Sequence, residues 1–217
     1  AFGGRLRSSV TCTSCKYSSN TYDPFLDLSL EINKAPTIVK ALEHFTTIEV
    51  LDGANKYICS KCKRKVKAHK RFTIDKAPNV LTINLKRFMY GSYGGKIDRM
   101  VDFATKLDLT PFMSKRKEPQ HREKYTLYGV LVHSGHSTQS GHYYSFVRTG
   151  SGPWHAMDDS RVGRVSEQTV LKQRAYMLFY IRDAERPKPK PQPSPSPAAP
   201  LPTPSPSAPT LAPSKPS

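Results

Sequence analysis

Alternating apolar and polar residues predict most of the secondary structure of this chain. In residues 22–32, YDPFLDLSLEI, leucine or isoleucine occupies every second position after Phe25, which is typical of a strand with one buried face. Four other runs are rich in β-branched and aromatic residues and are predicted to be strands, at residues 79–88, 125–135, 141–150 and 174–183.

Two segments carry helical signals instead. Thr37 is placed to cap a helix, and Ser166 is placed to cap a short one within residues 160–174. The apolar residues after Thr37 recur at helical spacing and are expected to pack on the core, namely Ile38, Val39, Leu42 and Phe45. Because strands dominate and the helices are few, the sequence predicts an antiparallel α+β fold.

The composition changes near the C-terminal end. From Arg186 onward the chain consists almost entirely of Pro, Ser, Ala and Thr, with too little apolar surface to offset the entropy of ordering. We therefore expect a folded domain over residues 1–185 and a disordered Pro/Ser-rich tail over residues 186–217. Pro-x-x-Pro spacings such as Pro197 to Pro200 could dock an SH3-like or WW-like groove, although a plain spacer is the favoured interpretation.

The formal net charge of +17 adds candidate partners. Every acidic residue precedes Arg186, so most of the excess belongs to the folded domain, which would attract acidic partners such as RNA, chromatin or an acidic protein face. A solvated basic face is the alternative, and charge alone does not separate the two. No stretch approaches the roughly 18 apolar residues of a membrane span, so we expect a soluble, monomeric domain without a membrane partner.

The four cysteines form two Cys-x-x-Cys pairs, at Cys12, Cys15, Cys59 and Cys62. Two intervening residues let one turn aim both sulfurs at the same ion, so the pattern predicts a tetrahedral, structural Zn²⁺ site with no open position for water. A redox pair and a site that has lost its metal are the alternatives. The pattern also favours a reducing compartment, the nucleus or the cytosol.

A histidine and two aspartates suggest acid–base chemistry. Gly150 and Gly152 separate two extended runs, which predicts a hairpin that pairs His142 with Asp158 and points Asp159 to the opposite face. A one-residue slip would exchange the two aspartates. A purely structural hydrogen bond between them is the first alternative. The other is a metal site at the remaining nearby imidazoles, His133, His136 and His155.

Several motifs occur in an order that resembles the C-terminal part of the catalytic domain of ubiquitin-specific proteases, over nearly all of residues 2–182. They are FGGRLRSSVTCTSCKY, YDPFLDLSLEI, YICSKCKRKVKAHKRFTIDKAPNVLTINLKRF, YGVLVHSG, GHYYSFVR, WHAMDDSRV and AYMLFYIR. The chain looks closest to the basic branch that includes nucleolar and plant members. The resemblance implies a papain-like cysteine protease fold, here with zinc-ribbon fingers and a palm but without the thumb.

The resemblance also implies residue roles. His142 matches the general base, Asp158 the acid that orients it, and Asp159 an auxiliary acid. The loop MYGSYGGKI, residues 89–97, matches a mobile segment near the ubiquitin tail. The zinc ligands would be Cys12, Cys15, Cys59 and Cys62.

The family's nucleophile is a thumb cysteine, which we expect upstream of Ala1 because the four cysteines here are used by the zinc site. The chain also begins without an initiator Met, as expected of a fragment, and alone should be inactive. The expected function is hydrolysis of isopeptide bonds after the C-terminal glycine of ubiquitin, with ubiquitin and ubiquitinated proteins as partners. A non-catalytic ubiquitin-binding module and a zinc-ribbon nucleic-acid binder are the alternatives.

Overall fold

A computed structural model describes residues 1–88, 95–115, 123–135, 137 and 140–184 of the chain. The chain divides into two units, Ala1–Ala184 and Glu185–Ser217, and the second lies outside the described residues. The tail expected over residues 186–217 therefore lies outside them too, as do residues 89–94 of the loop expected to be mobile.

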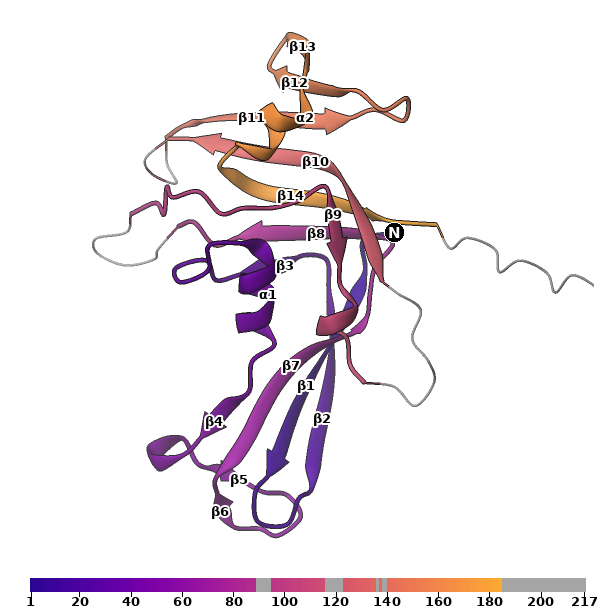
Figure 1. The fold of residues 1–217 in the computed structure, drawn as a ribbon. Coiled ribbons are helices and arrows are strands. Elements are labelled where there is room, and N and C mark those ends of the chain that lie inside the picture. The colour runs from indigo at the N-terminus through magenta and orange to yellow at the C-terminus, as the bar shows by residue number, and fades with distance from the viewer. Residues whose placement is uncertain (89–94, 116–122, 136, 138–139, 185–217) are drawn as a thin grey trace, which may run out of the picture. The chain divides into compact units, whose positions relative to one another are not determined.

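One antiparallel sheet, the finger sheet, forms a long projection with the strand order β2-β1-β7-β4 (Figure 1). Its strands are β1 (Gly4–Cys12), β2 (Ser18–Phe25), β4 (Glu49–Leu51) and β7 (Ala68–Lys76). The 3₁₀ turn η1 (Gly53–Asn55) and the short pair β5 (Tyr57–Ile58) and β6 (Lys65–Val66) lie between β4 and β7 in the chain. Both Cys-x-x-Cys segments lie at strand ends: Cys12 is the last residue of β1, and Cys59 directly follows β5.

A second sheet, the palm sheet, has the order β13-β12-β11-β10-β14-β8-β3, with β9 paired to β10 at its side. Its pairs are antiparallel except β3 with β8, which is parallel. The strands are β3 (Leu28–Leu30), β8 (Val80–Leu85), β9 (Lys106–Asp108), β10 (Lys124–Ser134), β11 (His142–Arg148), β12 (Trp154–Asp158), β13 (Arg161–Val165) and β14 (Ala175–Arg182). The remaining elements are α1 (Ile38–Phe45), η2 (Thr110–Phe112) and α2 (Glu167–Leu171). The predicted sheet-dominated α+β fold is confirmed.

The strand predicted over residues 22–32 is two strands instead of one. β2 ends at Phe25 in the finger sheet, and β3 begins at Leu28 in the palm sheet, so the chain crosses between sheets at the intervening residues. Leu26, expected inside, is 70 % exposed at this crossing. Phe25, the exception to the alternation, is buried because its ring lies across Gly4 on the facing strand, where a Cβ atom would come within 2.3 Å of it.

Both predicted caps are present. The side chain of Thr37 accepts a hydrogen bond from the Lys40 N–H at 3.1 Å, and that of Ser166 accepts one from the Thr169 N–H at 3.1 Å. The apolar face of α1 is narrower than predicted, since Val39 is 45 % exposed. A helix of two turns buries only the stripe that touches the palm sheet, so an apolar residue next to that stripe stays in solvent.

The main core lies against the palm sheet and includes the inner residues of β3, β8, β10 and β14 together with α1. The finger tip has almost no core of its own. The buried cluster there consists of Cys12, Cys59 and Val66, packed by the partly buried Cys15, Tyr57 and Cys62. The two sites predicted from the sequence are therefore stabilised differently. The His142–Asp158 pair lies on a sheet that packs on the main core, whereas the four cysteines themselves make up most of the small cluster at the finger tip.

Candidate active site and metal centre

His142 and Asp158 are in contact at one end of the palm sheet. His142 is the first residue of β11, and Asp158 is the last residue of the neighbouring β12. Nε2 of His142 forms a hydrogen bond and ion pair with Oδ1 of Asp158. The predicted meeting of these two side chains is therefore present in the structure.

The register of this hairpin differs from the predicted one by two residues. Ser145, not Tyr143, lies opposite Met157 in the β11–β12 ladder. Continued toward the end of the sheet, the ladder would place Tyr144 opposite Asp158, so His142 reaches Asp158 diagonally. A shift of two residues leaves every side chain on its face of the sheet, which is why the contact survives the error in register.

The predicted orientation of the Asp159 side chain was wrong. It was expected on the opposite face, but its carboxylate joins the same cluster: one ligand atom each from His142, Asp158 and Asp159 all lie within 4.8 Å of one another. Strand alternation stops at Asp158, which pairs with Arg161 across a tight turn. Asp159 sits in that turn with φ of 49°, a left-handed conformation that Asp tolerates better than most residues.

The two carboxylates set the electrostatics of His142. The hydrogen bond to Asp158 raises the pKa of His142 above its ordinary value, and the charges of Asp158 and Asp159 act in the same direction, whereas desolvation opposes them. The side chains of His142 and Asp158 are 48 % and 50 % exposed, so the pair is open to a substrate. Because Nε2 is engaged by Asp158, Nδ1 is the nitrogen left to exchange a proton with a reacting group.

Gly141, directly before His142, has no room for a side chain. In the structure a Cβ atom on Gly141 would lie 2.2 Å from Nε2 of His133 and 2.6 Å from the Ser134 carbonyl oxygen, so the glycine accommodates the protein's own groups. Its φ of 155° also disfavours other residues.

His133 is not arranged as the metal ligand considered from the sequence. It is 4 % exposed on β10 and its ring contacts those of Phe88, Tyr143 and Tyr176. Neither His133 nor His155 belongs to a group of close potential ligands among the described residues, and His136 lies outside them. Sequence reasoning missed His133 as a packing partner of Gly141; its place on a buried face of a predicted strand was the available signal.

The four cysteines converge as predicted. One sulfur from each of Cys12, Cys15, Cys59 and Cys62 lies within 4.8 Å of the others, and all four are free thiols. Sγ of Cys15 and Sγ of Cys59 are 3.7 Å apart. A tetrahedral zinc with Zn–S bonds of about 2.3 Å places its sulfurs about 3.8 Å apart, so the cluster fits that ion.

The two Cys-x-x-Cys turns have the same local geometry. The N–H of Lys16 donates to the Cys12 carbonyl at 3.0 Å, and the N–H of Lys63 donates to the Cys59 carbonyl at 2.8 Å. Both lysines have left-handed φ values, 61° and 56°. Backbone N–H groups favour the thiolate at two of the four cysteines: the pKa of Cys12 is lowered to about 6, chiefly by the N–H of Cys15, and that of Cys62 is lowered chiefly by the N–H of Arg64. The pKa of Cys15 is instead raised to about 11, with desolvation and the neighbouring thiols acting in that direction.

No helix in the described part of the chain is long and apolar enough to cross a membrane. A run of cations lies on the fingers. Between Asp52 and Asp75 the sequence has no acidic residue, and it has eight basic ones, Lys56, Lys61, Lys63, Arg64, Lys65, Lys67, Lys70 and Arg71. All of these but Lys70 are exposed.

Residues 1–180 match the family model described as ubiquitin carboxyl-terminal hydrolase. The chain is 56 % identical over 185 residues to ubiquitin carboxyl-terminal hydrolase 23 of Arabidopsis thaliana, covering 85 % of this chain and 21 % of that protein. It is 50 % identical over 182 residues to human ubiquitin carboxyl-terminal hydrolase 42, covering 83 % of this chain and 13 % of that protein. The chain thus spans only about a fifth or less of the length of relatives such as these.

A solved structure with the same fold is that of the SAGA Ubp8/Sgf11/Sus1/Sgf73 DUB module bound to ubiquitin aldehyde. It superposes with a TM-score of 0.78 at 34 % sequence identity, covering 86 % of this chain and 42 % of that one. A second structure, of the same module with a substituted Ubp8 bound to monoubiquitin, gives a TM-score of 0.78 at 35 % identity over the same shares.

Proposed function

Since the chain belongs to the ubiquitin carboxyl-terminal hydrolase family, we propose that it supplies the histidine and aspartate of a cysteine-type deubiquitinase. The reaction is hydrolysis of the isopeptide bond between the C-terminal glycine of ubiquitin and a lysine amine. The observation that carries the proposal is the contact of His142 with Asp158, half-exposed at one end of the palm sheet.

His142 moves the proton in this proposal. A cysteine thiolate attacks the carbonyl carbon of the terminal glycine, and the carbon–nitrogen bond breaks as Nδ1 of His142 gives its proton to the leaving lysine amine. A water molecule then attacks the resulting thioester and gives a proton to His142, and the carbon–sulfur bond breaks to release the C-terminal carboxyl group of ubiquitin and restore the thiolate. Asp158 holds the imidazole through Nε2 and stabilises its cation, and Asp159 adds negative charge nearby.

The nucleophile is proposed to come from a segment outside this sequence. All four cysteines of the sequence lie in the finger cluster, so none is available beside His142. A cysteine has to reach Nδ1 of His142, and the relatives are several times longer than the part matched here. The present 217 residues are expected to be inactive alone.

We further propose that the cysteine cluster holds a structural Zn²⁺. The sulfur spacing, the matched turns and the near absence of a finger-tip core support this, because the metal would supply the cross-link that packing does not. Cys12, Cys15, Cys59 and Cys62 would each give one thiolate. The surrounding lysines offset the negative charge of that centre.

Ubiquitin carrying a cysteine-reactive group at its C-terminus tests the main proposal. The probe is added to the present chain and to a form extended to include the upstream region, with Asp158→Asn in the extended form as the matched variant. Labelling of the extended form only, slowed by Asp158→Asn, is the expected result. Absence of labelling in both forms while ubiquitin still binds would instead indicate a non-catalytic ubiquitin-binding module.

A second candidate concerns the basic fingers. Their run of exposed cations supports binding of an acidic partner, for which RNA or nucleosomal DNA is the proposed chemistry. Affinity for a mixed-sequence RNA or DNA should then fall steeply with salt, and charge reversal at Lys61, Lys63 and Lys65 should reduce that slope. No binding of either nucleic acid at low salt would contradict it.

We also propose that the protein is a monomer in the nucleus or cytosol, where the thiols stay reduced.

A further inference from the structure

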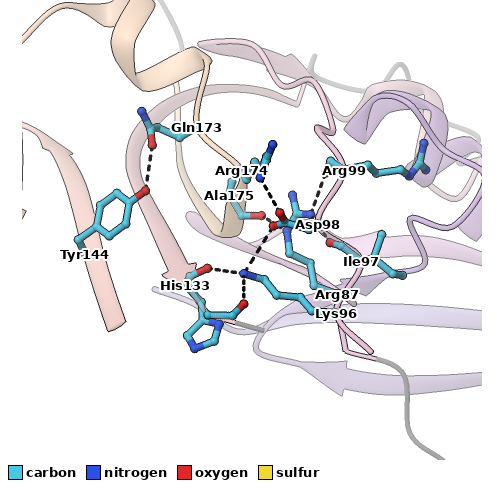
Figure 2. Close-up of polar contacts among 11 residues, drawn as sticks. Arg87, Lys96, Ile97, Asp98, Arg99, His133, Tyr144, Gln173, Arg174 and Ala175 are labelled. Carbon is cyan, nitrogen blue, oxygen red and sulfur yellow. Dashed lines mark hydrogen bonds and ion pairs between the residues drawn. The ribbon is translucent and has the colours of Figure 1, made fainter. Parts of the chain in front are cut away.

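Lys96 is a buried cation near the candidate active site. Only 6 % of its side chain is exposed. Its ammonium group donates hydrogen bonds to the carbonyl oxygens of His133 at 2.6 Å and Gly135 at 3.0 Å, as Figure 2 shows for His133. A buried ammonium is tolerated only where its N–H groups find partners, so these two carbonyls are a substantial part of what holds it.

The two carbonyls lie where the chain leaves β10 on its way to His142. His133 and Ser134 are the last residues of β10, and Ser134 is paired with His142 across the sheet. Gly135 approaches the returning chain closely, because a Cβ atom there would lie 2.5 Å from the Ser140 carbonyl oxygen and 2.7 Å from Cα of Gly141. A displacement of residues 133–135 would therefore be transmitted to residues 140–142.

The ring of His133 forms the other contact surface for this segment. Gly141 packs directly against it, as the 2.2 Å separation of a hypothetical Cβ from Nε2 shows. Burial lowers the pKa of His133, and the charge of Lys96 acts in the same direction. The backbone of His133 is thus fixed by Lys96, and its side chain supports Gly141.

Lys96 is itself anchored to the palm sheet. Its ammonium pairs with Asp98 at 3.7 Å, and Asp98 pairs with Arg174, just before β14, at 2.5 Å (Figure 2). Arg87, 1 % exposed, donates to the carbonyl oxygens of Ile97 at 2.7 Å and Arg99 at 2.9 Å on either side of Asp98, and to that of Ala175 at 2.7 Å. The segment that carries Lys96 is therefore held against β14 by a second buried cation.

We propose that Lys96 is a positioning residue for His142. By holding the carbonyl oxygens of His133 and Gly135, it fixes the end of β10 against which Gly141 and His142 are placed, and so keeps His142 at the distance and angle that Asp158 requires. Lys96 does not touch the reacting atoms. The effect of Lys96 on catalysis rests on the proposed function, but its effect on the contact of His142 with Asp158 can be measured without enzymatic activity.

The first experiment replaces Lys96 with methionine in the 217-residue chain, purified with zinc, and follows the histidine ring signals by NMR as the pH is changed. Methionine keeps the length and burial but removes the donors and the charge. The expected result is a downward shift of the pKa of His142 from its raised value toward the ordinary one. Lys86→Met is the matched control, because it removes an exposed lysine that pairs with Glu31 at the surface, and the pKa of His142 should not move.

The outcomes separate the two proposals. An unchanged pKa of His142 in folded Lys96→Met overturns the positioning role and leaves the proposed function intact. An ordinary pKa of His142 already in the wild-type chain overturns both, because the contact with Asp158 is then absent in solution. If Lys96→Met does not fold, Lys96→Gln takes its place under the same criteria, and if neither folds, Lys96 serves the fold as a whole and the proposal is wrong.

A kinetic readout follows in the form extended to include the nucleophile. A misplacement of a catalytic group by about 1 Å costs about 10²-fold in rate, so Lys96→Met should lower kcat by about that factor with little change in the KM for a ubiquitin substrate. Lys86→Met should leave both constants unchanged. An equal kcat in Lys96→Met and wild type would overturn the positioning role even if the pKa had moved.

Discussion

Nε2 of His142 bonds to Oδ1 of Asp158 although the two residues are not paired across the β11–β12 ladder. The contact is diagonal: it joins His142, the first residue of β11, to Asp158, the last residue of β12. It leaves Nδ1 free for a reacting group and lets Asp159, in the following turn, approach the same imidazole. One strand end thereby gathers a base and two acids.

Asp158→Asn should reduce turnover strongly and ubiquitin affinity little. The amide keeps the shape of the side chain but removes the negative charge that orients the imidazole and stabilises its cation. General acid–base catalysis contributes about 10²- to 10⁴-fold, so kcat in the extended form should fall within that range. Asp159→Asn is the control and should cost much less, because the hydrogen bond to His142 is made by Asp158. Equal losses in the two variants would show that neither carboxylate has a distinct role.

The same contact predicts a pH-dependent difference in stability. The pKa of His142 is raised in the folded state, so its contact with Asp158 stabilises the fold fully below the unfolded pKa of about 6.5 and loses that effect as the pH rises through the folded value. The difference in unfolding free energy between wild type and Asp158→Asn should therefore be larger near about pH 5.5 than near about pH 8.5. Denaturant titrations at the two pH values measure it; a larger difference at the higher pH would give the wrong sign.

The sequence predicts the face of each residue better than it predicts where a strand stops. Alternation placed His142 and Asp158 on one face correctly, because a two-residue error in the turn leaves the parity unchanged. It failed for Asp159 and Leu26, since both lie just beyond the end of a strand, where a turn or a crossing sets the direction of the side chain. Strand ends depend on pairing with distant segments, which a local pattern does not contain.

Lys96 shows a second limit of sequence reasoning. A lysine that follows a glycine-rich run is typical of an exposed loop, yet this one is buried, because its partners are carbonyl oxygens of His133 and Gly135, nearly forty residues away in the chain. Backbone carbonyls carry no signature in the sequence. The cysteine cluster is the opposite case, because its two pairs identify one another by residue type and spacing alone.

Metal removal should loosen the finger tip and leave the palm sheet intact. The buried cluster at the tip consists of only Cys12, Cys59 and Val66, so its order should depend on the proposed metal cross-link. Chelation should release about one zinc per chain under the four-thiolate assignment and lower the Tm by roughly 5 °C or more. Cys59→Ser should cause the same loss of zinc and the same decrease in Tm. The pKa of His142, measured by NMR, should stay raised in both cases. An unchanged Tm after the metal has been removed would contradict a structural role for zinc.

Gly141→Ala tests the close packing beside the base. The added Cβ would lie 2.2 Å from Nε2 of His133 and 2.6 Å from the Ser134 carbonyl oxygen, and both groups are held in the sheet, so the chain at residues 141–142 has to move instead. Overpacking of this kind typically costs about 1–3 kcal/mol, and the displaced His142 should lower kcat by about 10²-fold. Gly150→Ala, in the turn between β11 and β12, is the matched control, because nothing lies within 4 Å of its Cβ position. It should leave both the free energy of unfolding and kcat nearly unchanged, and a Gly141→Ala protein with wild-type kcat would show that the ring of His133 yields without moving the base.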